Sequence, residues 1–212
     1  HDTTHPPHPC LPTPHSRARP QEYTAALEQA KLALRLREAA HGGGAAVAVA
    51  AHLVQVGEAM AAAGAGTAEQ KIGLFEKAKR IWDGEYGEGQ HVATARCLVG
   101  IGLRYTIAKQ VGGLEDYPKA LEYGREALAV VQRSGKGGGI EEARPLALIG
   151  DAHWQLKQWD EALAHYQRRL RLLLDHHGEE GAKRVVEVAD AYQMVGDVYD
   201  DGKGDYKRAL EQ

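Results

Sequence analysis

The feature that most constrains the fold of this chain is a short segment that occurs four times at a nearly constant interval. Each copy has an aliphatic residue, a glycine, two further residues and a larger side chain: VGEAM at 56, IGLRY at 101, IGDAH at 149 and VGDVY at 195. The glycines Gly57, Gly102, Gly150 and Gly196 are 45, 48 and 46 residues apart. A period of this length indicates a repeat protein, in which one structural unit is copied along the chain.

A second segment alternates with the first and has an aromatic residue, two further residues and then Ala-Leu. It occurs as YTAAL at 23, YPKAL at 117, WDEAL at 159 and YKRAL at 206. Around Gln70 the spacing is kept, but Lys71 and Ile72 stand in place of Ala-Leu. Two alternating segments with helical spacing predict a helical hairpin as the unit, and each hairpin has an apolar side that only its neighbour can bury. We therefore predict an all-α solenoid of stacked antiparallel hairpins.

The small residues of both segments predict how the helices pack. Glycine inside a helix costs about 1 kcal/mol relative to alanine, so its recurrence predicts that a neighbouring helix backbone approaches closely there. The alanines that open the second helices allow those helices to cross the first ones tightly; they are Ala26, Ala120, Ala162 and Ala209. The aromatic residue three places before each alanine is expected to fill the hairpin.

Proline content separates an N-terminal segment from the repeats. Residues 1–20 contain six of the eight prolines and show no apolar periodicity, so we expect residues 1–21 to be disordered. Residues 22–212 form the predicted repeat domain. Its expected units are a half hairpin at 22–41 and hairpins at about 45–84, 88–133, 139–177 and 180–212.

Composition narrows the partners that such a chain can have. The net charge is -3 with both signs interspersed, so no basic field is present for a nucleic acid. No apolar run reaches the length needed for membrane insertion. The two cysteines, Cys10 and Cys97, have no partner at disulfide-framework or metal-ligand spacing, which makes the cytoplasm the expected compartment.

Three groups of residues resemble chemical sites, and we expect no catalytic, metal or cofactor site at any of them. The histidines near the N-terminus and Cys10 lie among prolines, without the rigid frame that a metal site needs. His176 and His177 precede Gly178 at a predicted helix end, where histidine complements the helix dipole. In SGKGGGIEE at 134 the lysine precedes the glycines, unlike a phosphate loop, in which Lys and Ser or Thr follow them.

The repeat pattern resembles the tetratricopeptide repeat, and its long period is similar to the kinesin light chain and Leu-Gly-Asn-repeat spindle-adaptor branches of that superfamily. The stretch from Leu74 to Tyr105 resembles the light-chain unit, although Val92 follows His91 where that unit has proline. The stretch from Trp159 to Tyr199 is more similar to the spindle-adaptor unit. The resemblance implies a right-handed superhelix whose first helices line a concave groove for a protein or peptide ligand.

The resemblance also implies which side chains face the groove, if the repeated glycine is the eighth residue of the unit. The positions one, four and five residues after that glycine and six before it give Arg96, Leu103, Thr106, Ile107, Arg144, Asp151, Trp154, Gln155, Asp190, Asp197 and Asp200, with Asp201 beside them and Glu58 from the first hairpin. The predicted groove is acidic at the fourth hairpin and mixed or apolar at the second. This favours a ligand with basic residues at one end and an aliphatic anchor toward the other.

Two interpretations stay open for several of these residues and for the chain as a whole. Trp154 is either a partner anchor or a packing residue against the next hairpin, and Arg96 and Arg144 either clamp carboxylates or are solvated helix residues. The chain is predicted to be an interaction scaffold or adaptor that is not an enzyme. The alternative is a regulatory or targeting module of a larger enzyme whose catalytic domain lies outside this sequence, and self-association is compatible with either.

Overall fold

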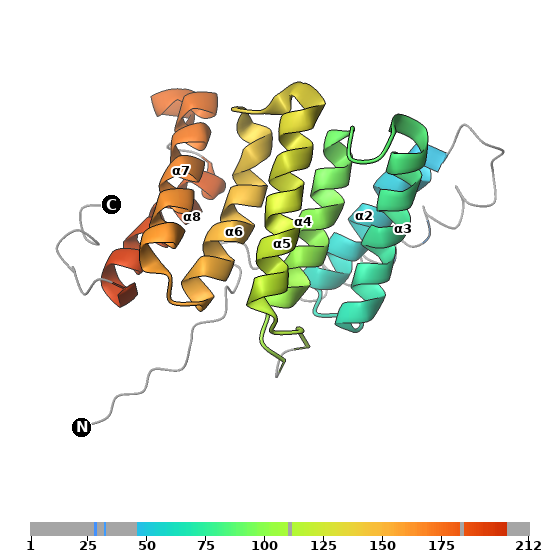
Figure 1. Ribbon diagram of the computed structural model, residues 1–212, viewed down its shortest axis with the longest axis horizontal. Helices are drawn as coiled ribbons and strands as arrows, with labels where there is room; N and C mark the ends of the chain where they lie inside the picture. Colours follow the sequence, from blue (N-terminus) through green and yellow to red (C-terminus); the bar gives the residue numbers. More distant parts are fainter. Residues whose placement is uncertain (1–27, 29–31, 33–45, 110–111, 183–184, 203–212) are drawn as a thin grey trace.

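The computed structural model describes residues 28, 32, 46–109, 112–182 and 185–202. Within this part of the chain all regular secondary structure is helical (Figure 1). The α-helices are α2 (Ala46–Ala62), α3 (Ala68–Tyr86), α4 (Val92–Thr106), α5 (Tyr117–Val131), α6 (Ala143–Gln155), α7 (Trp159–Ala182) and α8 (Val186–Asp197). Shorter helical turns are η4 (Gln132–Lys136), η5 (Ile140–Glu142) and η6 (Val198–Gly202).

The helices stack as a row of antiparallel hairpins (Figure 1). The helices α2 and α3, α4 and α5, and α6 and α7 pair within hairpins, and each hairpin packs its second helix on the first helix of the next. This confirms the predicted all-α solenoid. The predicted segment 1–21, the half hairpin at 22–41 apart from residues 28 and 32, and the end of the last hairpin at 203–212 lie outside the described residues.

Local sequence explains where the hairpin helices begin. Thr67 starts α3 with a capping box, because its hydroxyl accepts from the Gln70 backbone N–H while the Gln70 side chain accepts from the Thr67 N–H. Asp116 caps α5 by accepting from the Lys119 N–H at 3.1 Å. At the end of the third hairpin, Gly178 interrupts the helical conformation of α7 with φ 67°.

Gly57 and Gly150 make room for aromatic rings, and Gly102 makes room for the Leu148 side chain. Side chains, and not the predicted helix backbone, therefore approach these glycines. A methyl group added at Gly57 would lie 2.8 Å from Cζ of Phe75, and one at Gly150 would collide with the ring of Tyr166. Phe75 and Tyr166 lie four residues after the position of the repeated alanine, on the second helix. Tyr166 fills its hairpin where Trp159 was predicted to do so, and Phe75 fills the first hairpin, which has Ala68 at the position of the predicted aromatic residue.

The first helices form the more closely packed of the two layers of the stack. Helix α4 contacts both α2 and α6, whereas contacts between α3 and α5 or between α5 and α7 are at most marginal in the described part of the chain. A layer whose members lie closer together is the inner layer of a curved stack. Helix α8 packs on α7 without comparable contact with α6, so the inner layer consists of α2, α4 and α6.

Candidate functional site

Three charged side chains from the three inner helices meet on the surface of the stack. Arg96 of α4 donates to Glu58 of α2 through Nε, at 3.0 Å from Oε1, and through Nη2, at 2.5 Å from Oε2. Arg144 of α6 donates from Nη1 to the same Oε1 at 3.3 Å. We call Glu58, Arg96 and Arg144 the inner-layer cluster. It connects three successive hairpins through a single carboxylate.

The inner-layer cluster is charged and open to solvent. About half of the Arg96 side chain and 64% of the Arg144 side chain are exposed. Partial burial raises the pKa of Glu58, but hydrogen bonds and positive charge from Arg96 and Arg144 outweigh it, so the pKa is lowered overall. The hydrogen bond to Glu58 raises the pKa of Arg96. Two guanidinium groups therefore share one carboxylate, and each keeps N–H donors that a second carboxylate can reach.

Repeat register explains why these side chains meet. Arg96 and Arg144 each lie six residues before a repeated glycine, Gly102 and Gly150 respectively, and Glu58 directly follows Gly57. The arginines share one repeat position, so stacking places them on the same face of adjacent hairpins. The structure thus brings together three of the residues that the sequence assigned to the groove.

The other predicted residues of the second hairpin lie at the end of α4. Leu103 packs partly buried against the core, and its carbonyl accepts from the Thr106 hydroxyl at 3.1 Å. Ile107 is the C-cap of α4, and its carbonyl accepts from the Glu115 N–H at 3.0 Å. These contacts are local and leave the predicted contact with a partner untested.

The predicted residues of the third hairpin face inward more than expected. Asp151 is buried, and the Tyr166 hydroxyl donates to its Oδ1 at 2.8 Å. Burial raises the pKa of Asp151 to about 6, although the Tyr166 hydrogen bond and the charge of Arg169 act in the opposite direction. The structure therefore places Asp151 in the hairpin interior, where it cannot present a carboxylate to a groove ligand.

Trp154 and Gln155 are only half-buried at the end of α6. The Trp154 ring packs edge-on against Trp159, with centroids 6.4 Å apart, and its side chain contacts the core of the C-terminal hairpins. Its indole Nε1 is buried without a hydrogen-bond acceptor among the described residues. These contacts support the packing interpretation of Trp154.

The predicted acidic residues of the fourth hairpin do not join the inner-layer cluster. Asp190 is half-buried, and burial raises its pKa while Arg169 lowers it. Asp197 ends α8, and Asp200 and Asp201 lie exposed in η6. Because α8 makes no close contact with α6, the predicted acidic end of the groove is separated from Arg96 and Arg144.

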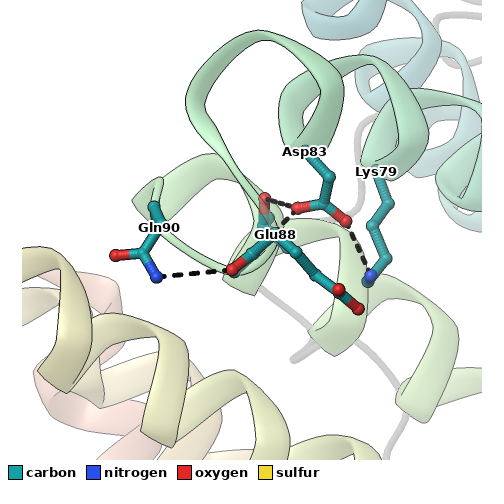
Figure 2. A network of polar contacts seen from close by, with 6 residues as sticks. Lys79, Asp83, Glu88 and Gln90 are labelled. Atoms are coloured by element: carbon teal, nitrogen blue, oxygen red, sulfur yellow. Dashed lines mark hydrogen bonds and ion pairs between the residues drawn. The ribbon is translucent and has the colours of Figure 1, made fainter.

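A polar network fixes the turn that leads into α4 and so positions Arg96. Figure 2 shows Asp83 accepting from Lys79 Nζ at 2.7 Å. Asp83 also accepts from the Gly89 N–H and the Thr94 hydroxyl, both at 3.1 Å. Burial raises the pKa of Asp83, but these hydrogen bonds lower it overall. The carboxylate thus ties the end of α3 to the start of α4.

His91 in the same turn has a structural role. Its Nδ1 accepts from the Ala93 N–H at 3.1 Å and caps α4. Its ring stacks on those of Trp82 and Tyr86, with centroids 5.0 Å and 4.4 Å apart. A helix cap and a ring stack thus hold the entry to α4.

The residue groups that resembled chemical sites hold no cluster of metal ligands within the described ranges. The His176 and His177 rings pack edge to face, with centroids 4.8 Å apart, and the N-terminal histidines lie outside the described residues. In the glycine-rich turn, the Gly138 N–H donates to the buried Glu142 carboxylate at 2.9 Å.

Cys97 is buried, which raises its pKa to about 12. No described helix is long and apolar enough to span a bilayer.

Three buried cations were not predicted from the sequence: Lys71 of α3, Arg104 of α4 and Arg169 of α7. Only 6% of Lys71 and 9% of Arg104 is exposed. The signal for Lys71 was visible, because it stands where the other hairpins have alanine in the Ala-Leu segment.

Comparison with known proteins supports the tetratricopeptide-type fold. The tetratricopeptide repeat family matches residues 112–175, which span α5 and α6 and most of α7. The crystal structure of BtubC (BKLC) from P. vanneervenii matches with a TM-score of 0.66 and 18% sequence identity, over 90% of this chain and 70% of that chain. A search of curated proteins gives no significant match.

The chain is therefore an all-α solenoid in which residues 112–175 are similar to the tetratricopeptide repeat family. Repeats of this family generally mediate interactions between proteins and have no catalytic role of their own.

Proposed function

We propose that this protein is an interaction scaffold that binds an extended segment of a protein partner along the inner layer formed by α2, α4 and α6. The observation that carries the proposal is the inner-layer cluster, in which one carboxylate and two exposed guanidinium groups come from three successive hairpins. A segment lying along this surface would cross all three hairpins at once. We further propose an adaptor role in the cytoplasm, similar to that of the kinesin light chain and spindle-adaptor branches.

The chemistry of the cluster favours a partner carboxylate at this point. Arginine binds carboxylates through parallel N–H donors, and Arg144 uses only one of its donors on Glu58 at 3.3 Å. An incoming carboxylate can bind Arg144 while Arg96 keeps its two bonds to Glu58. Contacts of this kind, at the rim of an interface, add specificity and association rate more than affinity.

Selection of displayed random peptides against the full chain tests this proposal. We expect the selected peptides to share an acidic residue and to bind an Arg96→Ala, Arg144→Ala double variant roughly tenfold more weakly, because two charge-assisted contacts are lost. Fluorescence anisotropy of labelled peptides measures the affinities. The matched control is Arg125→Ala, which removes an exposed arginine from the second helix α5.

Two results would count against the inner-layer assignment. One is equal affinity of the peptides for the wild type and the double variant. The other is an equal loss of affinity in Arg125→Ala, because a general effect of positive charge would then explain the binding.

A further inference from the structure

Lys71 and Arg104 stand where the other hairpins bury alanine. Lys71 has the repeat position of Ala120 and Ala162, and Arg104, two residues after Gly102, has that of Ala152. All three alanines have 0% exposure. The interface between α3 and α4 therefore contains two cationic side chains at positions that a methyl group fills elsewhere in the stack.

Neither cation has a partner within the described part of the chain. No hydrogen bond or ion pair joins Lys71 or Arg104 to a carboxylate there, and Arg104 Nε is buried without an acceptor. Burial lowers the pKa of Lys71, and the nearby positive charge of Arg104 lowers it further. Burial alone lowers the pKa of Arg104. The two cations thus lie close enough to repel each other.

An uncompensated pair of this kind is costly. Holding a cation away from water is unfavourable unless an opposite charge and hydrogen bonds compensate it. The fold does not need these charges, because alanine fills the same positions in neighbouring hairpins. An anion from outside the chain would remove both the desolvation cost and the repulsion.

We propose that Lys71 and Arg104 form a binding site for a phosphate group between the first turn of α3 and the last turn of α4. The antiparallel arrangement of α3 and α4 brings these two turns to the same edge of the stack, the lower edge in Figure 1. Each of the two side chains keeps a small exposed fraction. The site lies apart from the inner-layer cluster and does not depend on the proposed function.

The number of charges favours phosphate over a carboxylate. A phosphate group has a charge of about -1.5 to -2 near neutral pH and compensates both cations, whereas a carboxylate compensates only one. The planar arginine fork and the lysine point charge are both common phosphate ligands. The group can belong to free phosphate or to a phosphorylated side chain of a partner, and the chemistry at the protein is the same.

Phosphorus-31 NMR of inorganic phosphate mixed with the full chain tests the site directly. In HEPES buffer at about pH 7.5 and constant ionic strength, we expect the chain to broaden the phosphate resonance. Thermal unfolding gives a second readout, because a phosphate concentration of ten times Kd lowers the unfolding equilibrium constant about elevenfold. The Lys71→Met, Arg104→Met double variant should lose both effects, while Arg125→Met, which removes an exposed arginine, should keep them.

The double variant also separates binding from general stabilisation, because phosphate stabilises most proteins by being excluded from their surface. If circular dichroism shows that the methionine variant is unfolded, the single variants Lys71→Ala and Arg104→Ala replace it, since alanine fits the equivalent positions. O-phosphoserine distinguishes the two sources of the group: tighter binding than inorganic phosphate indicates a phosphorylated partner, and weaker binding indicates free phosphate.

Three results would overturn the proposal. They are unchanged phosphate resonances at up to roughly 20 mM phosphate, equal broadening by the double variant and the wild type, and equal stabilisation by acetate and phosphate at matched ionic strength.

Discussion

Two interfaces of this stack bury basic side chains in opposite ways. Between α3 and α4, Lys71 and Arg104 lie beside each other without a carboxylate among the described residues. Between α7 and α8, Arg169 is also buried, but its positive charge acts on the carboxyl groups of Asp151 and Asp190. We call these the open interface and the compensated interface.

The comparison teaches that burial of a charge in this fold does not by itself indicate a binding site. In the compensated interface, Arg169 Nη1 contacts Met194 Sδ at 3.2 Å, and the Tyr166 hydroxyl donates to Asp151. Arg169 Nε is buried without an acceptor among the described residues, so the compensation comes from the charges of Asp151 and Asp190. Among the described residues, the open interface has no carboxylate that compensates its two cations. The difference gives the two interfaces opposite responses to substitution.

The largest expected change in the free energy of unfolding comes from a substitution that removes the cation of the compensated interface. Arg169→Met should lower the free energy of unfolding by about 2 kcal/mol at pH 7, because buried Asp151 loses its positive neighbour. Protonation of the carboxyl group limits this cost, so the loss should shrink at pH 5. Urea unfolding at both pH values measures it. A loss that is equal at pH 5 and pH 7 would show that Arg169 acts through packing alone.

Removal of a cation from the open interface should instead raise the free energy of unfolding. Lys71→Met keeps most of the side-chain volume and removes a charge without a carboxylate partner, so it should raise the free energy of unfolding by up to about 1 kcal/mol in phosphate-free buffer, because solvent screens part of the charge. Urea unfolding measures this gain, with exposed Lys77→Met as the matched control on the same helix. Destabilisation by Lys71→Met would mean that the lysine is compensated after all.

The compensated interface should also make stability depend on pH. The folded-state pKa of Asp151 is about 6, above its ordinary value of 3.8, so the folded chain binds more protons between these values. The stability that the protonated Asp151 carboxyl group contributes is therefore present at low pH and is lost as the pH rises through about 6. From pH 7 to pH 5 the gain should be about 1.4 kcal/mol.

Urea unfolding of the wild type and Asp151→Asn across this range isolates the gain, because asparagine does not titrate. Parallel pH profiles of the two proteins would contradict the assignment to Asp151.

The smallest expected effect concerns the inner-layer cluster. Glu58→Gln should change the free energy of unfolding by less than about 1 kcal/mol, because exposed ion pairs contribute little to stability. Thermal unfolding at low and high salt measures it. A loss above 2 kcal/mol would make the cluster a structural element and would weaken its assignment to partner binding.

Much of the fold was predictable because it depends on local and repeated features. Helical spacing and the interval between Gly57, Gly102 and Gly150 predicted hairpins that stack. The same register placed Arg96 and Arg144 on one face. The packing partner of the glycines was not predictable, because sequence spacing does not show which of two nearby aromatic residues points into the hairpin.

Residues at predicted groove positions are buried or exposed according to the side chains that surround them in the folded chain. Asp151 shares its helix with exposed Arg144, yet it is buried, because Tyr166 and Arg169 of α7 enclose it. Lys71 was visible as a departure from the Ala-Leu segment, and Arg104 as an arginine at the repeat position of Ala59 and Ala152. Neither could be identified as unpaired from the sequence, because the absence of a carboxylate depends on the elements packed around them.

The sequence by itself determined that this protein is a row of helical hairpins, since periodic apolar residues and small residues at a fixed interval leave each unit a side that only a similar unit can cover. The tertiary structure decided which charges meet, because charges up to 86 residues apart, such as Glu58 and Arg144, interact only after the hairpins have stacked. Charge pairing depends on distances of a few ångströms between separate helices, and periodicity along one helix contains no information about them.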